Sequence, residues 1–193
     1  MLDPPPIVAV MTLLNSATTP TITPEDRAGR LTEAGTAWGA RISADASAAQ
    51  LTYRVSGIGA GSVATTVRAG KHEFLVDEPA ALAGDDVAAS PVEFALGALI
   101  SCQVVVYRLY AQALGIAVDD ITIDATGELD ARTLFGIEGG PRAGFTSIHL
   151  DIAITGPETE ERYNELRAAV DAHCPVLDLF ANATPVTATV TKG

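Results

Sequence analysis

The stretch SPVEFALGALISCQVVVYRLYAQALG, residues 90–115, decides the fold of this chain. Ser90 can cap a helix, Pro91 occupies the first helical position without losing a hydrogen bond, and Glu93 completes a capping box. Gly115 suits the residue just past the helix end. We therefore predict one helix over residues 91–114, roughly 36 Å long at 1.5 Å per residue.

Apolar residues occupy nearly the whole circumference of this predicted helix, so other structure must cover all of its faces. A single small sheet cannot do that, and the sequence therefore indicates a dimer or an intertwined second half of the chain. The same stretch is not interpreted as a membrane span, because it contains four charged or amide side chains: Glu93, Gln103, Arg108 and Gln112.

The residues before the helix alternate as β-strands do. Residues 51–55 begin a first strand, the glycines between 57 and 61 predict a turn, and residues 62–68 form a second strand. A tight turn at 69–71 leads into a third strand over 72–76, which makes an antiparallel meander. The acidic segment 77–89 is expected to be a surface loop in which Asp77, Glu78 and Pro79 shape a turn.

After the helix, we predict strands over 116–129 and 145–155 with a loop between them. An amphipathic helix over 157–173 follows, interrupted at Cys174-Pro175, and residues 185–190 form a last short strand. This order of elements predicts an α+β domain with antiparallel sheets around a long buried central helix.

The N-terminal part is expected to be separate from this domain. Residues 1–23 have no clear period and are predicted to be a loose arm, and Thr23-Pro24 starts a short helix to about Ala40. We therefore divide the chain into an N-terminal arm with a short helix, residues 1–49, and a main domain, residues 50–193.

Composition excludes some functions. The formal net charge is −12 and no basic run is present, which argues against a nucleic-acid partner. The N-terminus lacks the basic start of a secretory signal, so we expect a cytoplasmic protein with no membrane partner. Two cysteines and three scattered histidines give no ligand-spaced cluster, and we predict no metal and no cofactor.

The two cysteines are the candidate reactive groups. Cys102 lies in the middle of the long apolar helix, and Cys174 lies at the end of the second helix. In a cytosolic protein a static disulfide between them is a poor default. Taken alone, the pair is equally well explained as two unrelated buried thiols.

Their surroundings carry a family resemblance. The segments VDEP at 76–79, Gly84 and SPVEFALGALISC at 90–102 follow one another in the order and spacing of the first-cysteine signature of OsmC-like proteins. The segment HCPV at 173–176 resembles the second-cysteine motif of that family. The chain thus resembles the OsmC/Ohr family over about residues 50–193.

The resemblance implies a homodimer of intertwined chains with active sites at the interface. It implies that Cys102 attacks an organic hydroperoxide and becomes a sulfenic acid, which Cys174 converts to a transient disulfide. A small dithiol or a lipoylated protein would then reduce the disulfide.

A buried thiol needs a nearby cation to ionise, and in the peroxidase branch an Arg held by a Glu has this role. Arg68, with Arg54 as its rival, is our candidate for the Arg. The branch's Glu position is Val92 here. Glu93, one step further on, is our candidate for the Glu. At 100° per residue it lies about 180° round the helix from Cys102, and its capping role would also explain it without catalysis.

Two alternatives therefore stay open. The first is an OsmC-like protein that binds a hydrophobic ligand or senses redox state without fast peroxidase activity, which the Val92 mismatch favours. The second is a purely structural pair of cysteines.

Overall fold

The computed structural model describes residues 20–193, so most of the predicted N-terminal arm lies outside the described residues. The regular elements are the helices α2 (Pro24–Ala44), α3 (Pro91–Leu114), α4 (Glu160–His173) and α5 (Pro175–Ala181), and the strands β1 (Val55–Ala60), β2 (Ala64–Ala69), β3 (His72–Val76), β4 (Asp120–Glu128) and β5 (Ser147–Thr155). Two short 3₁₀ turns lie at Ala46–Ala49 and Ala80–Leu82. The predicted α+β class is confirmed.

The long helix α3 begins and ends where the sequence predicts. The Ser90 hydroxyl accepts from the Glu93 backbone N–H at 3.4 Å, and the Glu93 carboxylate accepts from the Ser90 backbone N–H at 2.7 Å. Gly115 ends the helix in the left-handed conformation, with φ 62°. These contacts are local, which is why the sequence alone specifies both ends of the helix.

The strands form two separate antiparallel sheets. Strands β1, β2 and β3 form the predicted meander, and β4 pairs with β5 from Asp120↔Thr155 to Glu128↔Ser147. One turn was placed wrongly: Gly57 and Gly59 lie inside β1, and the turn comes at residues 61–63, where Gly61 has φ 55°. The strand extends through these glycines because each pairs with a residue of β2.

The C-terminal part departs from the prediction. Residues 185–190 form no strand and are exposed, with Val186 at 88% and Val190 at 96%. A strand needs a neighbouring edge, and within the described residues this segment has none. Residues 175–181 form α5, a helix that was not predicted. Pro175 ends the hydrogen bonding of α4 and also occupies the first position of the new helix.

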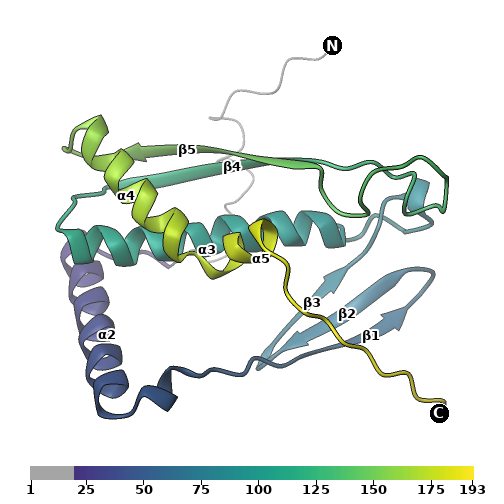
Figure 1. Cartoon of the computed structure of the whole chain (residues 1–193), viewed down its shortest axis with the longest axis horizontal. Helices are drawn as coiled ribbons and strands as arrows, with labels where there is room; N and C mark the ends of the chain where they lie inside the picture. The colour runs from purple at the N-terminus through teal and green to yellow at the C-terminus, as the bar shows by residue number, and fades with distance from the viewer. Residues whose placement is uncertain (1–19) are drawn as a thin grey trace.

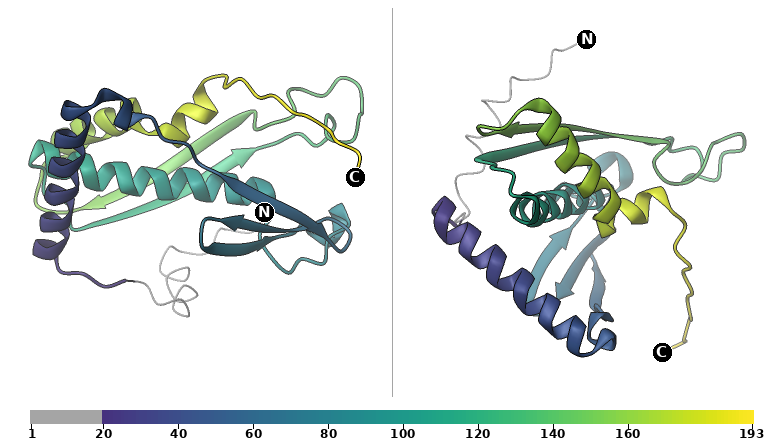
Figure 2. Two further views of the ribbon diagram at one scale, coloured as in Figure 1. Left: turned by 90° about the horizontal axis from the view of Figure 1, so that it is seen from below. Right: turned by 60° about the vertical axis from the view of Figure 1, so that its left-hand side comes forward.

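The arrangement in space leaves α3 covered on some sides only (Figure 1). The β4–β5 pair, α4 and α5 pack against it, and α2 lies across its C-terminal end (Figure 2). The buried residues of α3 form one stripe: Leu99, Gln103, Val106, Tyr107 and Ala111. A single chain therefore does not bury the whole helix, as the sequence analysis expected.

Exposed apolar side chains mark the uncovered sides. Val105 on α3 is 56% exposed, and Ile58 on β1 is 75% exposed. The β1–β3 sheet lies apart from β4–β5 in both figures, and the stacking of Phe74 on Phe94, with ring centroids 5.1 Å apart, links it to α3. By length and composition α3 is apolar enough to cross a membrane, but α2, α4, α5 and β4 pack against it.

The loop between β3 and α3 is tightly closed around Asp77. This carboxylate is only 2% exposed and accepts from the backbone N–H groups of Asp85 at 3.0 Å and Val87 at 3.3 Å. A hydrogen bond from the Glu78 backbone N–H is the main reason that the pKa of Asp77 is lowered. A side chain at Gly84 would overlap the Glu78 backbone, so this position requires glycine.

We therefore predict that Gly84→Ala lowers the free energy of unfolding by more than about 2 kcal/mol, because the added methyl group meets backbone that cannot move aside. Gly39→Ala is the matched control. Its methyl group would meet nothing in α2, and it should raise the unfolding free energy by about 0.5–1 kcal/mol. Urea unfolding measures both, and equal effects would contradict the close approach at Gly84.

Candidate functional site

The structure brings the two cysteines together, although they are 72 positions apart in the chain. Cys102 is half-buried on α3, and Cys174 is 2% exposed at the junction of α4 and α5. Both thiols are free, and Cys174 lies in the core cluster against which Cys102 packs. Cys174 and the backbone N–H of Val176 are near enough to Cys102 to affect the pKa of its thiol.

The break between α4 and α5 positions Cys174. Its backbone N–H closes α4 on the Val170 carbonyl at 2.9 Å, and its own carbonyl accepts from Asp178 in α5 at 3.1 Å. Pro175 has no N–H to continue α4, so the chain turns at this point. The turn directs both the Cys174 thiol and the Val176 N–H toward α3.

The electrostatics of the site favour a protonated Cys102 in the single chain. Burial is the main cause that raises the pKa of the Cys102 thiol, the Val176 N–H opposes it, and the neighbouring Cys174 thiol adds to it. No Arg or Lys among the described residues contributes to this pKa. A buried thiol without a cation reacts slowly as a nucleophile.

Glu93 lies away from the thiols, as its helical phase predicts. Its carboxylate also accepts from the Ser90 hydroxyl at 2.7 Å, and these Ser90 hydrogen bonds lower the pKa of Glu93. The carboxylate is thus used in the helix cap. Among residues 20–193, the hydrogen bonds of the Glu93 carboxylate are those of the helix cap.

Arg68 is not brought to Cys102 by its own chain. It is exposed on β2, opposite Glu73 of β3, and its Nε donates to the Gly70 carbonyl at 3.4 Å. Arg54, the rival candidate, is exposed just before β1. The cation that the family resemblance implies is therefore absent from the thiol site of one chain within residues 20–193.

His173 faces away from the neighbouring Cys174, as expected for adjacent helical residues. Its Nδ1 lies 2.7 Å from the Ala169 carbonyl, and its ring stacks on Tyr110 with centroids 4.6 Å apart. These contacts hold the imidazole at the C-terminus of α4, where a positive charge is favourable. In addition, residues 20–193 contain no cluster of three or more His, Cys, Asp or Glu side chains placed to bind a metal.

Comparison with known proteins fits this geometry. The sequence profile of OsmC-like proteins matches residues 84–189, which are 106 of the 193 residues and include both cysteines. The chain belongs to the OsmC-like protein family. No curated protein matches the sequence significantly.

Solved structures show the same fold as this OsmC-like protein. The OsmC-like protein from Mycoplasma pneumoniae has a TM-score of 0.60 at 19% identity, over 68% of this chain and 89% of that one. An organic hydroperoxide resistance protein OsmC from Legionella pneumophila has a TM-score of 0.54 at 20% identity, over 68% and 90%. An organic hydroperoxide resistance protein from Elizabethkingia anophelis has a TM-score of 0.53 at 23% identity, over 67% and 88%.

One feature of this OsmC-like protein was not found from its sequence. Gln103, next to Cys102, and Tyr107, one turn further along α3, are both 0% exposed. Neither polar atom of the Gln103 amide nor the Tyr107 hydroxyl has a hydrogen-bond partner among the described residues. Burial, reinforced by the charge of Asp171, raises the pKa of Tyr107 to about 12. The signal in the sequence is a glutamine inside an apolar run, Gln103.

We predict that Tyr107→Phe raises the free energy of unfolding by about 1 kcal/mol, because a buried hydroxyl without a partner is unfavourable. Tyr163→Phe is the control and should lower it by about 1 kcal/mol, since the Tyr163 hydroxyl donates to Ala117 at 3.1 Å and accepts from Glu158 at 3.2 Å. Urea unfolding at neutral pH measures both.

The pH dependence gives a second readout. The folded-state pKa of Tyr107 lies above its ordinary value of 10.0, so the wild type should lose stability relative to Tyr107→Phe as pH rises from 10 toward 12. If Tyr107→Phe destabilised the protein as much as Tyr163→Phe, the hydroxyl would have a partner.

Proposed function

We propose that this OsmC-like protein is a thiol-dependent peroxidase that reduces organic hydroperoxides with Cys102 and Cys174. The observation that carries the proposal is the contact between two free thiols from distant parts of the chain, one half-buried and the other fully buried. Two family members with the same fold are known as organic hydroperoxide resistance proteins, which supports this substrate class.

The half-buried thiol is the one that peroxide can reach. The Cys102 thiolate attacks the outer oxygen of the hydroperoxide, the O–O bond breaks, and the alkoxide takes up a proton and leaves as an alcohol. Cys102 is then a sulfenic acid. The apolar surroundings of Cys102 favour an organic hydroperoxide over hydrogen peroxide.

The buried thiol completes the cycle. Cys174 attacks the sulfenic sulfur, hydroxide leaves with a proton as water, and a Cys102–Cys174 disulfide remains. A small dithiol or a lipoylated protein then supplies two electrons and two protons to restore both thiols. Such a reductant is expected in the cytoplasm, where we place this protein.

Ionisation of Cys102 requires a second copy of the chain in this proposal. Burial opposes the thiolate, and no cation of the same chain within residues 20–193 offsets it. Arg68 lies on a sheet whose apolar residues are open, so a partner chain that packs there would bring it into an interface. We propose that Arg68 of one copy faces Cys102 of the other.

The exposed surface supports an assembly of at least two chains. The chain exposes 14596 Å², whereas a compact monomer of its mass exposes about 8,700 Å². Even a fully exposed segment as long as residues 1–19 would add only about 2,800 Å². Thousands of square ångströms of surface thus remain, which is the size of an obligate dimer interface.

We predict that the protein consumes cumene hydroperoxide with a dithiol as reductant, and that Cys102→Ser lowers the rate by a factor of at least about 10³. Cys174→Ser should give one turnover per chain and then stop, with a sulfenic acid on Cys102 that dimedone captures. Stopped-flow measurement of peroxide tests both. No turnover by the wild type, or normal turnover by Cys102→Ser, contradicts the proposal.

Two arginine variants in the same peroxide assay test whether Arg68 activates Cys102. Arg68→Gln should slow the reaction tenfold or more, about the effect of one pKa unit on the thiolate fraction. Arg54→Gln should leave it within a factor of about two. An equal response of both variants would mean that Arg68 does not act on Cys102.

The alternative is an OsmC-like protein that binds a hydrophobic ligand or senses redox state. Two observations favour it: no described cation reaches Cys102, and Val92, at the family's Glu position, is 41% exposed and apolar. Disulfide formation by diamide without peroxide turnover would select a redox sensor. If diamide formed no disulfide either, a binding or structural role would remain.

We predict a homodimer by size-exclusion chromatography with light scattering. Val105→Glu should shift it toward monomer, because this 56% exposed residue lies on an uncovered side of α3 and would place a charge in the interface. Ala34→Glu on the exposed face of α2 should leave the mass unchanged. A monomeric wild type would rule out this arrangement.

A further inference from the structure

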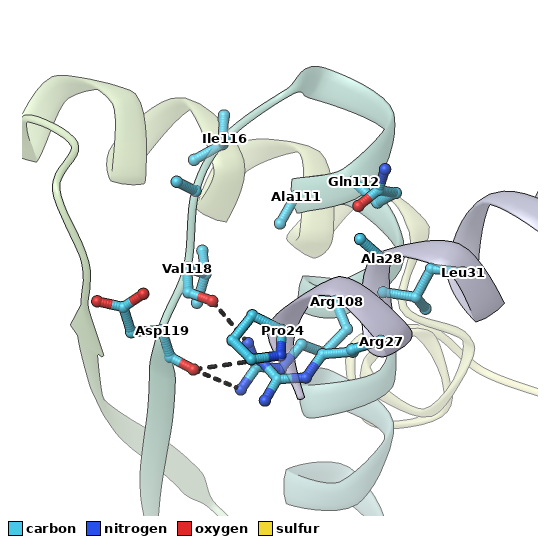
Figure 3. A pocket seen from close by; sticks show the side chains of 11 residues that line it. Pro24, Arg27, Ala28, Leu31, Arg108, Ala111, Gln112, Ile116, Val118 and Asp119 are labelled. Atoms are coloured by element: carbon cyan, nitrogen blue, oxygen red, sulfur yellow. Dashed lines mark hydrogen bonds between the residues drawn. The ribbon is translucent and has the colours of Figure 1, made fainter. Parts of the chain in front are cut away.

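A cavity that neither cysteine lines lies between α2, α3 and the start of β4 (Figure 3). It has a volume of about 200 Å³, and it is lined by Leu31 of α2, Ala111 of α3, and Ile116 and Val118 before β4. Neither α2 nor its residues fall within the matched family segment, so this cavity depends on a helix that lies outside it.

Two guanidinium groups meet in this cavity. Arg108 donates to the Val118 carbonyl at 2.9 Å and to the Asp119 carbonyl at 3.1 Å, and Arg27 donates to the same Asp119 carbonyl at 3.3 Å. Figure 3 shows the two side chains lying side by side from different helices. Carbonyl groups are neutral, so these three hydrogen bonds leave two adjacent positive charges without a counter-ion.

Acidic residues are near but do not pair with them. The charges of Asp119 and Asp120 act on Arg108, and Glu25 and Asp26 precede Arg27 in α2. Within residues 20–193, no carboxylate lies within ion-pair distance of either guanidinium; the ion pairs there involve other residues. In Figure 3 the Asp119 carboxylate points away from the two arginines.

The two positive charges repel each other, and only part of this repulsion is offset by nearby acidic residues. Burial and the charge of Arg27 lower the pKa of Arg108, while the charges of Asp120 and Asp119 act in the opposite direction. Arg27 also lies near the N-terminus of α2, where the helix dipole disfavours a cation. Each guanidinium has five N–H donors, so most of them are not used by the three carbonyl contacts.

We propose that this cavity binds a small organic carboxylate, held by Arg27 and Arg108 with its apolar part against Leu31, Ala111 and Ile116. A guanidinium fork matches a carboxylate in geometry and charge. A cavity of this volume holds about six or seven water molecules, which fits an acid of six to eight non-hydrogen atoms. The proposal depends on neither cysteine and is separate from the peroxidase function.

Calorimetric titration of the full chain with hexanoate tests the site. We expect hexanoate to bind and hexan-1-ol, which has the same chain without the charge, to bind at least about tenfold more weakly. Arg27→Gln and Arg108→Gln should each weaken hexanoate binding about tenfold. Arg30→Gln, an exposed arginine of the same helix, is the matched control and should stay within a factor of about two.

Arg108→Gln also removes hydrogen bonds to the segment before β4, so two measurements that do not depend on this variant are added. Hexanoate should shift the amide signals of Ala28, Ala111 and Val118 in NMR spectra, and it should bind Cys102→Ser as well as the wild type. Equal binding of hexanol, equal loss in Arg27→Gln and Arg30→Gln, or tighter binding of inorganic phosphate than of hexanoate would each overturn the proposal.

Discussion

The long apolar helix α3 has to be removed from water, and one chain removes only part of it. Its buried stripe faces α4 and the β4–β5 pair, while Val105 and Leu109 on other sides remain exposed. At roughly 25 cal/mol per square ångström, leaving such a surface open would cost many kilocalories per mole. The separate β1–β3 sheet also exposes apolar side chains to solvent, among them Ile58 and Val55. An intertwined pair of chains would cover both apolar surfaces, that of α3 and that of the β1–β3 sheet.

The same constraint controls the chemistry of the thiols. The burial that holds Cys174 against Cys102 also raises the pKa of Cys102, so the contact that makes a disulfide possible works against the thiolate that would start the reaction. Only the Val176 N–H opposes this burial among the described groups. If a partner chain supplies the cation, then assembly and activation are one event, and an isolated chain would keep the Cys102 thiol protonated and unreactive.

Local signals in the sequence specified a large part of the fold. The ends of α3 follow from Ser90, Glu93 and Gly115, whose contacts lie within a few residues, and the start of α2 follows from Thr23 for the same reason. The strand predicted at 185–190 was wrong because a strand depends on a neighbouring edge, which no local pattern reveals. The division of the chain at residue 49 stays a prediction, as does each catalytic role.

The candidate site, too, could be predicted only in part. The proximity of Cys102 and Cys174 was implied by the family resemblance, and no reading of spacing alone would have given it. The lack of a hydrogen-bond partner at Gln103 and Tyr107 could not be predicted, because it is a property of the packed core.

The meeting of Arg27 and Arg108 had no signal in the sequence at all, because it depends on how α2 crosses the end of α3. Bringing two positive charges together costs free energy, and proteins usually offset this cost with a nearby carboxylate. Here no described carboxylate forms an ion pair with Arg27 or Arg108, although the chain has twice as many acidic residues as basic ones, 24 against 12. Both guanidinium groups line the cavity and keep unused N–H donors, so an anion that enters it can pair with both.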